Sequence, residues 1–170
     1  GTVVTMAEGI SLYGGFAASD WNVRMLDWGD RDLIADQTVI ENIEADATGN
    51  LTVPISTVYC GAEVTSSTII EGFTIISGKG SGGLGTQACM FVLGDPEIRK
   101  TLFEGREKTD AGRYMTGVHL YTSDAVISDN VFDIKWNYDG SSGERSFGVY
   151  IDTSSPTITR NHIDPGEGTY

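Results

Sequence analysis

The chain has 170 residues, a formal net charge of −13 and two cysteines. Its length suits one domain with its own core, and its acidity argues against nucleic acid, which needs concentrated Lys and Arg to neutralise phosphates. The sequence has no signal peptide and no apolar stretch long enough to cross a membrane, so we expect no membrane insertion; a signal removed upstream stays open.

The first apolar runs are short and divided by glycine. Val4 and Met6 alternate with polar residues, the segment 10–16 reads ISLYGGF, and a further run spans residues 39–43. Alternation at a period of two is typical of strands, whose side chains point to opposite faces in turn. We therefore predict an irregular first unit built from short strands.

Between these runs, residues 27–32 read DWGDRD and bring three carboxylates close together. Carboxylate oxygens suit Ca²⁺, so Asp27, Asp30 and Asp32 are the candidate metal ligands. The rest of a calcium-loop pattern is missing and Arg31 lies among the acids, so the alternative is a surface excursion fastened onto the fold. We expect no resident cofactor or metal, with Ca²⁺ as the alternative.

Two further units begin with the apolar segments 58–60 (VYC) and 89–92 (CMFV). Cys60 and Cys89 lie 29 residues apart, so we expect them to be neighbours in the core, at equivalent inward positions on rungs about 4.8 Å apart. That separation is compatible with a disulfide and with two buried thiols. The sequence leaves the oxidation state open.

The clearest feature is a repeat in the second half of the chain. Residues 117–133 are echoed 31 positions later by residues 148–164, with Gly, Val, Thr, Ser, Ile, Asn and Asp recurring in register. Self-similarity at such a period is typical of a solenoid, whose units bury a core by stacking. Alternation predicts inward side chains for Val118, Leu120, Val149 and Ile151, and outward ones for His119, Tyr121, Tyr150 and Asp152.

A second strand follows in each repeat, marked by two apolar residues with four residues between them. These pairs span residues 70–75, 98–103, 127–132 and 158–163. Asn130 and Asn161 occupy equivalent turn positions, with Thr101 one unit earlier, and stacked amides can hydrogen-bond along the axis. Short runs of β-branched and aromatic residues, broken by 22 glycines and without helical spacing, predict an all-β chain.

These motifs resemble one known architecture. The segments 10–16, 68–78 (TIIEGFTIISG), 126–133 (VISDNVFD) and 157–164 (TITRNHID) are similar to coils of the pectate-lyase-like group, in particular its bacterial surface and lipoprotein members. The resemblance implies a right-handed parallel β-helix of about five coils and an extracellular, cell-surface or periplasmic location. Because a solenoid needs polar caps and neither end offers one, we expect residues 1–170 to be a single domain within a longer protein.

Outward side chains on the longest strands form a candidate site. We expect two columns along the axis, with Met90, His119 and Tyr150 in one and Val92, Tyr121 and Asp152 in the other. Ring faces and hydroxyls suit a sugar, and the resembled enzymes bind substrate on this sheet. The alternative is an ordinary solvated face with aromatic cross-strand pairs.

The loops between units supply a second candidate surface along one edge. Insertions in a solenoid usually line one face, often the binding face, and residues 104–116 and 133–147 are rich in basic and aromatic side chains. The candidate ligand-binding residues there are Arg113, Tyr114, Trp136, Tyr138 and Arg145. They would suit an anionic glycan or a protein partner, and solvated loops without a partner are the alternative.

Catalysis has little support in the sequence. The motifs of the resembled polygalacturonase-like enzymes are missing, and no Arg or Lys on the neighbouring strands accompanies Asp152 as in pectate lyases. If the chain is a lyase or hydrolase of an acidic glycan, then His119, Asp152 and Tyr150 are the catalytic candidates by their side-chain chemistry. We expect instead a non-catalytic exported module that binds a glycan or protein partner. A structural component of a filament, sheath or surface layer, self-assembling through the solenoid ends, is a third hypothesis.

Overall fold

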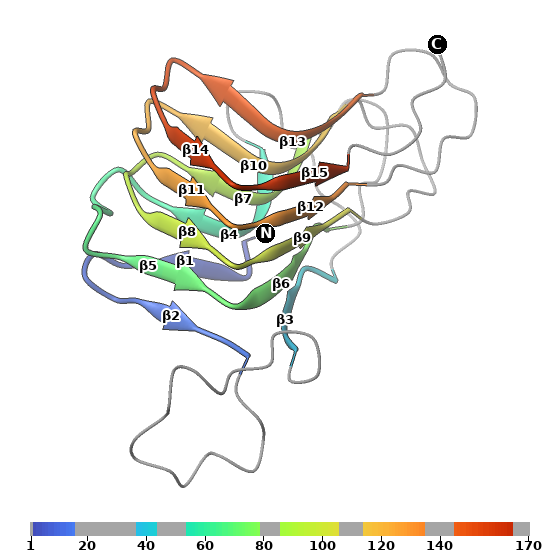
Figure 1. Ribbon diagram of the computed structural model, residues 1–170, viewed down its shortest axis with the longest axis horizontal. Helices are drawn as coiled ribbons and strands as arrows, with labels where there is room; N and C mark the ends of the chain where they lie inside the picture. The colour runs from blue at the N-terminus through green and yellow to red at the C-terminus, as the bar shows by residue number, and fades with distance from the viewer. Residues whose placement is uncertain are drawn as a thin grey trace, which may run out of the picture.

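The computed structural model describes residues 2–15, 37–43, 54–78, 86–105, 114–134 and 145–164. Within these ranges the chain forms fifteen strands and no helix. The strands make three parallel sheets of five strands each, named here sheets A, B and C (Figure 1).

Each coil of the chain gives one strand to each sheet. In stacking order, sheet A contains β1 (Val4–Met6), β4 (Ile55–Cys60), β7 (Thr86–Val92), β10 (Tyr114–Tyr121) and β13 (Arg145–Asp152). Sheet B contains β2 (Leu12–Tyr13), β5 (Ile69–Glu71), β8 (Glu97–Arg99), β11 (Val126–Ser128) and β14 (Thr157–Thr159). Sheet C contains β3 (Thr38–Glu41), β6 (Phe73–Ile76), β9 (Leu102–Glu104), β12 (Val131–Asp133) and β15 (His162–Asp164). The fold is therefore an all-β parallel β-helix of five coils, which confirms the sequence prediction.

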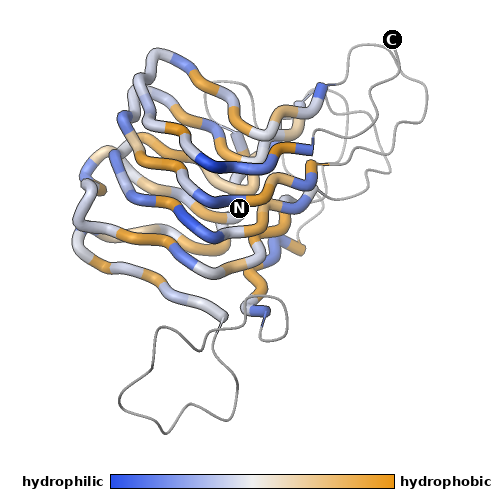
Figure 2. Tube along the Cα trace, viewed as in Figure 1, coloured by the Kyte–Doolittle hydropathy of each residue, from blue (hydrophilic) through white to orange (hydrophobic). Residues whose placement is uncertain are grey.

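Interior side chains stack in columns that run through all five coils, and orange apolar positions recur along the strands in Figure 2. The sheet A column is Met6, Cys60, Val92, Leu120 and Ile151. The sheet B column is Leu12, Ile70, Ile98, Ile127 and Ile158. The sheet C column is Ile40, Ile75, Phe103, Phe132 and Ile163. In the three middle coils every member is fully buried, which stabilises the fold by about 1.5–3 kcal/mol for each large side chain.

Sheet A departs from simple alternation in the middle of its strands. Gly117 and Val118 both face the interior, since Val118 lies in the core and a Cβ on Gly117 would meet the ring of Phe132 at 2.5 Å. One coil earlier, the Cys89 thiol donates to the Glu104 carbonyl inside the coil, and the next residue is also buried in the core. Alternation therefore breaks at this level in β7 and β10, and the outward positions beyond it shift by one residue.

The cysteine register predicted from the sequence is wrong. Cys60 pairs with Val92, whereas Cys89 lies three positions earlier on the same strand, a distance of about 10 Å along the sheet. Both cysteines are buried free thiols, and burial raises the pKa of each thiol to about 12. They are core residues on adjacent rungs without being neighbours.

The predicted outward positions of Met90 and Val92 are also wrong. Met90 pairs with Val118, Val92 pairs with Leu120, and both are fully buried in the core. The residue beside His119 on this face is Phe91. The aromatic surface therefore reaches the third coil, beyond the patch that the sequence predicts.

The asparagine ladder at the corner between sheets B and C is confirmed. The Asn130 side chain accepts a hydrogen bond from the Thr101 backbone N–H at 3.0 Å, and the Asn161 side chain accepts one from the Asn130 N–H at 2.9 Å. Asn130 also donates to the Ile98 carbonyl and to Asn161, both at 3.0 Å. The residue before each member of the ladder lies in the left-handed region, with φ of 47° at Lys100, 58° at Asp129 and 54° at Arg160.

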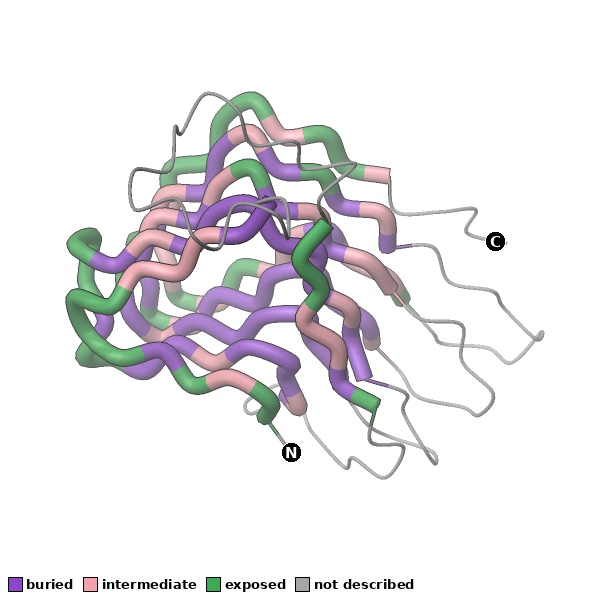
Figure 3. Tube along the Cα trace, turned by 90° about the horizontal axis from the view of Figure 1, so that it is seen from below, coloured by how far each residue is buried: buried purple, intermediate pink, exposed green. Residues whose placement is uncertain are grey.

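The last coil leaves its interior uncovered. Ile151 was predicted to be buried, but it is 48% exposed, and Val149 is only half-buried. The reason is position, because Leu120 at the same register one coil earlier is fully buried. Figure 3 shows buried residues concentrated in the middle coils and exposed ones at the ends.

Candidate functional site: an aromatic groove on sheet A

The outer face of sheet A carries a row of aromatic rings, one from each of the last four coils, while Thr5 holds this register in the first coil. Tyr59, Phe91, His119 and Tyr150 follow one another along the axis, with ring centroids 5.9, 5.1 and 4.7 Å apart. The two contacts of His119 are edge-to-face, the geometry that aromatic pairs prefer. Parallel pairing in register creates this row, because equivalent positions of successive coils lie next to each other.

The row continues toward the start of the strands. Phe147 packs edge-on against Tyr150 at 5.4 Å and stacks with Tyr114 at 6.2 Å. Tyr114 and Arg145 begin β10 and β13 and are paired in register, with Arg145 exposed. The structure thus connects two of the predicted loop-edge residues with the predicted aromatic patch.

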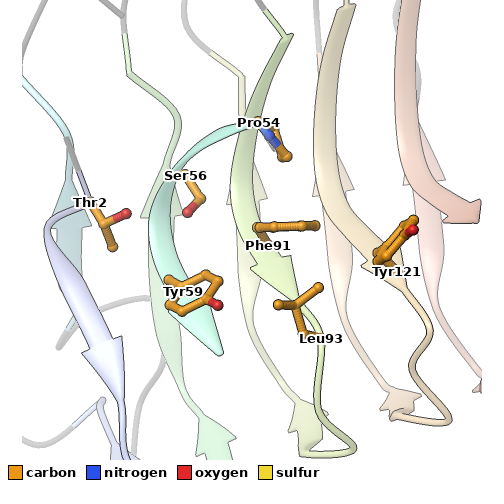
Figure 4. A pocket seen from close by; sticks show the side chains of 7 residues that line it. All are labelled: Thr2, Pro54, Ser56, Tyr59, Phe91, Leu93 and Tyr121. Carbon is orange, nitrogen blue, oxygen red and sulfur yellow. The ribbon is translucent and has the colours of Figure 1, made fainter. Parts of the chain in front are cut away.

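A groove of about 370 Å³ opens over β4, β7 and β10 (Figure 4). Phe91, only 3% exposed, and Leu93 lie between Tyr59 and Tyr121, which are half-buried and keep accessible ring surface. The remaining lining residues are Thr2, Pro54 and Ser56. The groove therefore offers ring faces, apolar surface and a few hydroxyls, and none of these lining side chains is charged.

His119 faces outward as predicted, yet it is fully buried. Neither ring nitrogen has a hydrogen-bond partner within the ranges that the structure describes. Burial lowers the pKa of His119 from 6.5 to about 4, and the nearby carboxylate of Asp152 opposes that shift. The imidazole is consequently neutral at physiological pH and closed off from a substrate in solution.

The other patch residues lie together but are less exposed than predicted. Tyr150 pairs in register with His119, and Asp152 pairs with Tyr121. Tyr121, Tyr150 and Asp152 are all half-buried. The Asp152 carboxylate accepts a hydrogen bond from the Thr153 hydroxyl at 2.9 Å. His119 and Tyr150 pack edge to face, and Tyr121 and Asp152 are paired two residues further along the same strands, so the four residues lie close together.

Several candidates lie outside the described residues. They are Arg113, Trp136 and Tyr138 on the loop edge, and Asp27, Asp30 and Asp32 for the metal. Among the residues that the structure does describe, no three His, Cys, Asp or Glu side chains are grouped so as to hold a metal ion. The same ranges contain no helix long and apolar enough to cross a membrane.

Sequence reasoning missed Tyr59, Phe91 and Leu93, which line the groove. A signal was present, because aligning CMFV at 89–92 with GVHL at 117–120 puts Phe91 level with His119.

A scan against protein-family models and searches of curated proteins and of solved structures find no match to this chain.

Proposed function

We propose that this chain is a non-catalytic β-helix module, similar to surface members of the pectate-lyase-like group, that binds a glycan along the outer face of sheet A. The observation that carries the proposal is the groove between Tyr59 and Tyr121. Aromatic rings expose flat apolar faces, and sugars present C–H faces of matching size with hydroxyls at the rim. Two rings on a rigid sheet offer such stacking without the cost of ordering a loop.

The groove lining suits the apolar face and hydroxyls of a sugar ring better than it suits an acidic group on the sugar. Its polar groups are hydroxyls, those of Thr2, Ser56 and the two tyrosines, which can donate to and accept from sugar hydroxyls. Any pairing with acidic groups of a glycan would come from Arg145 at the strand start, together with the loop-edge candidate Arg113. We therefore propose stacking as the main contribution and charge as an accessory one.

A binding role fits the buried histidine better than catalysis does. General acid–base chemistry needs a titratable group within reach of the substrate and a pKa near the working pH. The pKa of His119 lies at about 4, and its ring is covered. Of the predicted catalytic trio, Asp152 and Tyr150 keep partial solvent contact and His119 does not.

An exported location accords with the proposed role. A surface with a net charge of −13 favours solubility, and glycan-binding modules act where free polysaccharide is met. We propose an extracellular, cell-surface or periplasmic module, without membrane insertion and without nucleic acid as a partner.

The test is a glycan array followed by titration calorimetry with the oligosaccharide that binds. Tyr59→Ala and Tyr121→Ala should each raise the Kd about tenfold, since a stacked ring contributes on the order of 1–1.5 kcal/mol. Val131→Ala is the control, because Val131 is 42% exposed on the outer face of sheet C, away from the groove.

Two results would count against the proposal. Unchanged affinity in both tyrosine variants would move the site away from this groove. No binding to any glycan, together with recovery of a specific protein partner, would replace the sugar by a protein.

A further inference from the structure

A second groove of about 360 Å³ lies on the outer face of sheet C, at the corner with sheet B. It crosses β6, β9 and β12, which lie side by side in the middle coils (Figure 1). Thr74, Leu102 and Val131 hold one register on these strands, so the groove runs along the solenoid axis. We call it the corner groove, to distinguish it from the groove on sheet A.

The apolar lining of the corner groove is mainly aliphatic. Leu102 is half-buried and Val131 is exposed, whereas the ring of Phe73 is only 9% exposed. The groove therefore offers aliphatic side chains and little ring surface. Such a lining suits an aliphatic chain, which gains by leaving water, better than it suits the flat face of a sugar.

Two side chains of opposite charge complete the lining. Lys100 and Asp129 hold equivalent positions at the corner, each in the left-handed region and each just before a residue of the ladder. The strands that precede them pair in register, so the two backbones lie on adjacent rungs, roughly 4.8 Å apart. The corner groove thus presents an ammonium and a carboxylate next to each other, beside an aliphatic surface.

Both charged groups are held in place and keep unused hydrogen-bonding capacity. The Lys100 ammonium donates to Glu71 at 3.2 Å, and the Asp129 carboxylate accepts two bonds from Arg160, each of 2.7 Å. An ammonium has three N–H donors and a carboxylate has about four acceptor sites, so each group can also bind a ligand. The bonds from Arg160 lower the pKa of Asp129, and the charge of Lys100 adds to this, so the carboxylate is ionised at neutral pH.

We propose that the corner groove binds a free α-amino acid with an aliphatic side chain. Its carboxylate pairs with Lys100, its ammonium pairs with Asp129, and its side chain packs on Leu102. Charge-assisted hydrogen bonds at both groups fix the orientation of the ligand. A simple anion meets the like charge of Asp129, and a simple cation meets that of Lys100. A peptide carries its two terminal charges far apart, whereas a free amino acid carries them on one carbon, as the groove requires.

The test is a titration of the isotope-labelled chain with L-leucine, followed by NMR shifts of the backbone amides. The amides of Thr101 and Leu102 should shift, while those of Phe91 and Tyr121 in the groove of sheet A should not. Leucinamide lacks the carboxylate and N-acetylleucine lacks the ammonium, so each should bind about tenfold more weakly than leucine. Free glycine keeps both charges and should also bind more weakly, because it has no side chain to pack on Leu102.

Two variants assign the charges. Lys100→Met keeps most of the stem and removes the ammonium, so leucine and leucinamide should bind it alike; Arg99 still holds Glu71 there. Asp129→Asn keeps the shape and removes the charge, so leucine and N-acetylleucine should bind it alike. Arg160→Gln is the matched control, because it breaks the same ion pair without removing a lining group, and it should keep the preference for leucine over N-acetylleucine. Circular dichroism checks the fold of each variant.

Two results would overturn the proposal. Amide shifts that stay absent up to the solubility limit of leucine, or that lie only elsewhere in the chain, would remove the site. Leucinamide or N-acetylleucine binding as tightly as leucine would refute recognition of a zwitterion. Neither result bears on glycan binding, because Tyr59→Ala, on another face of the solenoid, should leave leucine binding unchanged.

Discussion

Replacing His119 by Phe should stabilise the protein. The imidazole is fully buried between Phe91 and Tyr150, and neither nitrogen has a partner within the described ranges. A buried polar group without a partner costs about 1–3 kcal/mol, whereas a phenyl ring would keep both edge contacts. After allowance for its slightly larger size, the free energy of unfolding at pH 7 should rise by about 1–2 kcal/mol.

Lowering the pH should widen the difference between the two proteins. The pKa of His119 is about 4 in the folded protein, below its ordinary value of 6.5, because burial disfavours the charged ring. Between these values the unfolded chain binds a proton that the folded chain does not, so stability falls as the pH falls. The wild type should lose about 2 kcal/mol through this group between pH 7 and pH 5, and the Phe variant should lose none of it.

Urea unfolding followed by circular dichroism at the two pH values measures both effects. His162, the second of the two histidines, is exposed and present in both proteins, so the difference between them isolates His119. A less stable Phe variant, or one with the pH dependence of the wild type, would refute the reasoning. Either result would mean that the folded protein hydrogen-bonds or protonates this imidazole.

Three further predictions, covering five substitutions, are checked by the same urea titration. Asn130→Ala should lower the free energy of unfolding by about 3–4 kcal/mol, and Asn161→Ala by about 1–2 kcal/mol. Asn161 makes more hydrogen bonds, but only Asn130 is fully buried. A larger loss in the Asn161 variant would contradict this reasoning. Phe132→Ala should lower the free energy of unfolding by about 3–5 kcal/mol, and Ile163→Ala, in the exposed last coil of the same column, by about 1 kcal/mol. Equal losses would mean that Ile163 is covered in solution. Gly117→Ala should cost about 1–3 kcal/mol, since its Cβ would lie 2.6 Å from a backbone oxygen of the next coil, and a neutral effect would show that the strands can part there.

The coil architecture is predictable because its information is local and repeats. Ile98 and Ile127 recur at one register, and so do Asn130 and Asn161, and parallel pairing follows from that recurrence. Strands that recur at a fixed spacing in the sequence can bury their apolar side chains by stacking coil on coil. Prediction therefore succeeds for the inward positions of these segments and for the asparagine corner. It is wrong in taking each of these segments as one second strand, because the structure divides it at the corner into a strand of sheet B and a strand of sheet C.

The long strands of sheet A are predicted less well because two consecutive residues turn inward. Strict alternation has no means of anticipating that Gly117 and Val118 share one side. Cys89 is misplaced for a different reason, because Cys60 pairs with Val92, 32 residues later, whereas the sequence prediction uses an offset of 29. The exposed fraction of a side chain is also hard to predict from the sequence, because it depends on whether another coil stacks on that side chain. Ile151 has the pattern of a core residue and lacks the rung that would make it one.

Strand pairing joins each coil only to the coil before it and the coil after it. A molecule of this kind behaves as a one-dimensional array, in which stability is a sum of coil and nearest-neighbour contributions. Damage in the second coil and damage in the fifth should therefore be additive. Opening should also run inward from the ends, so that backbone amides beside Ile158 exchange with solvent sooner than those beside Ile98.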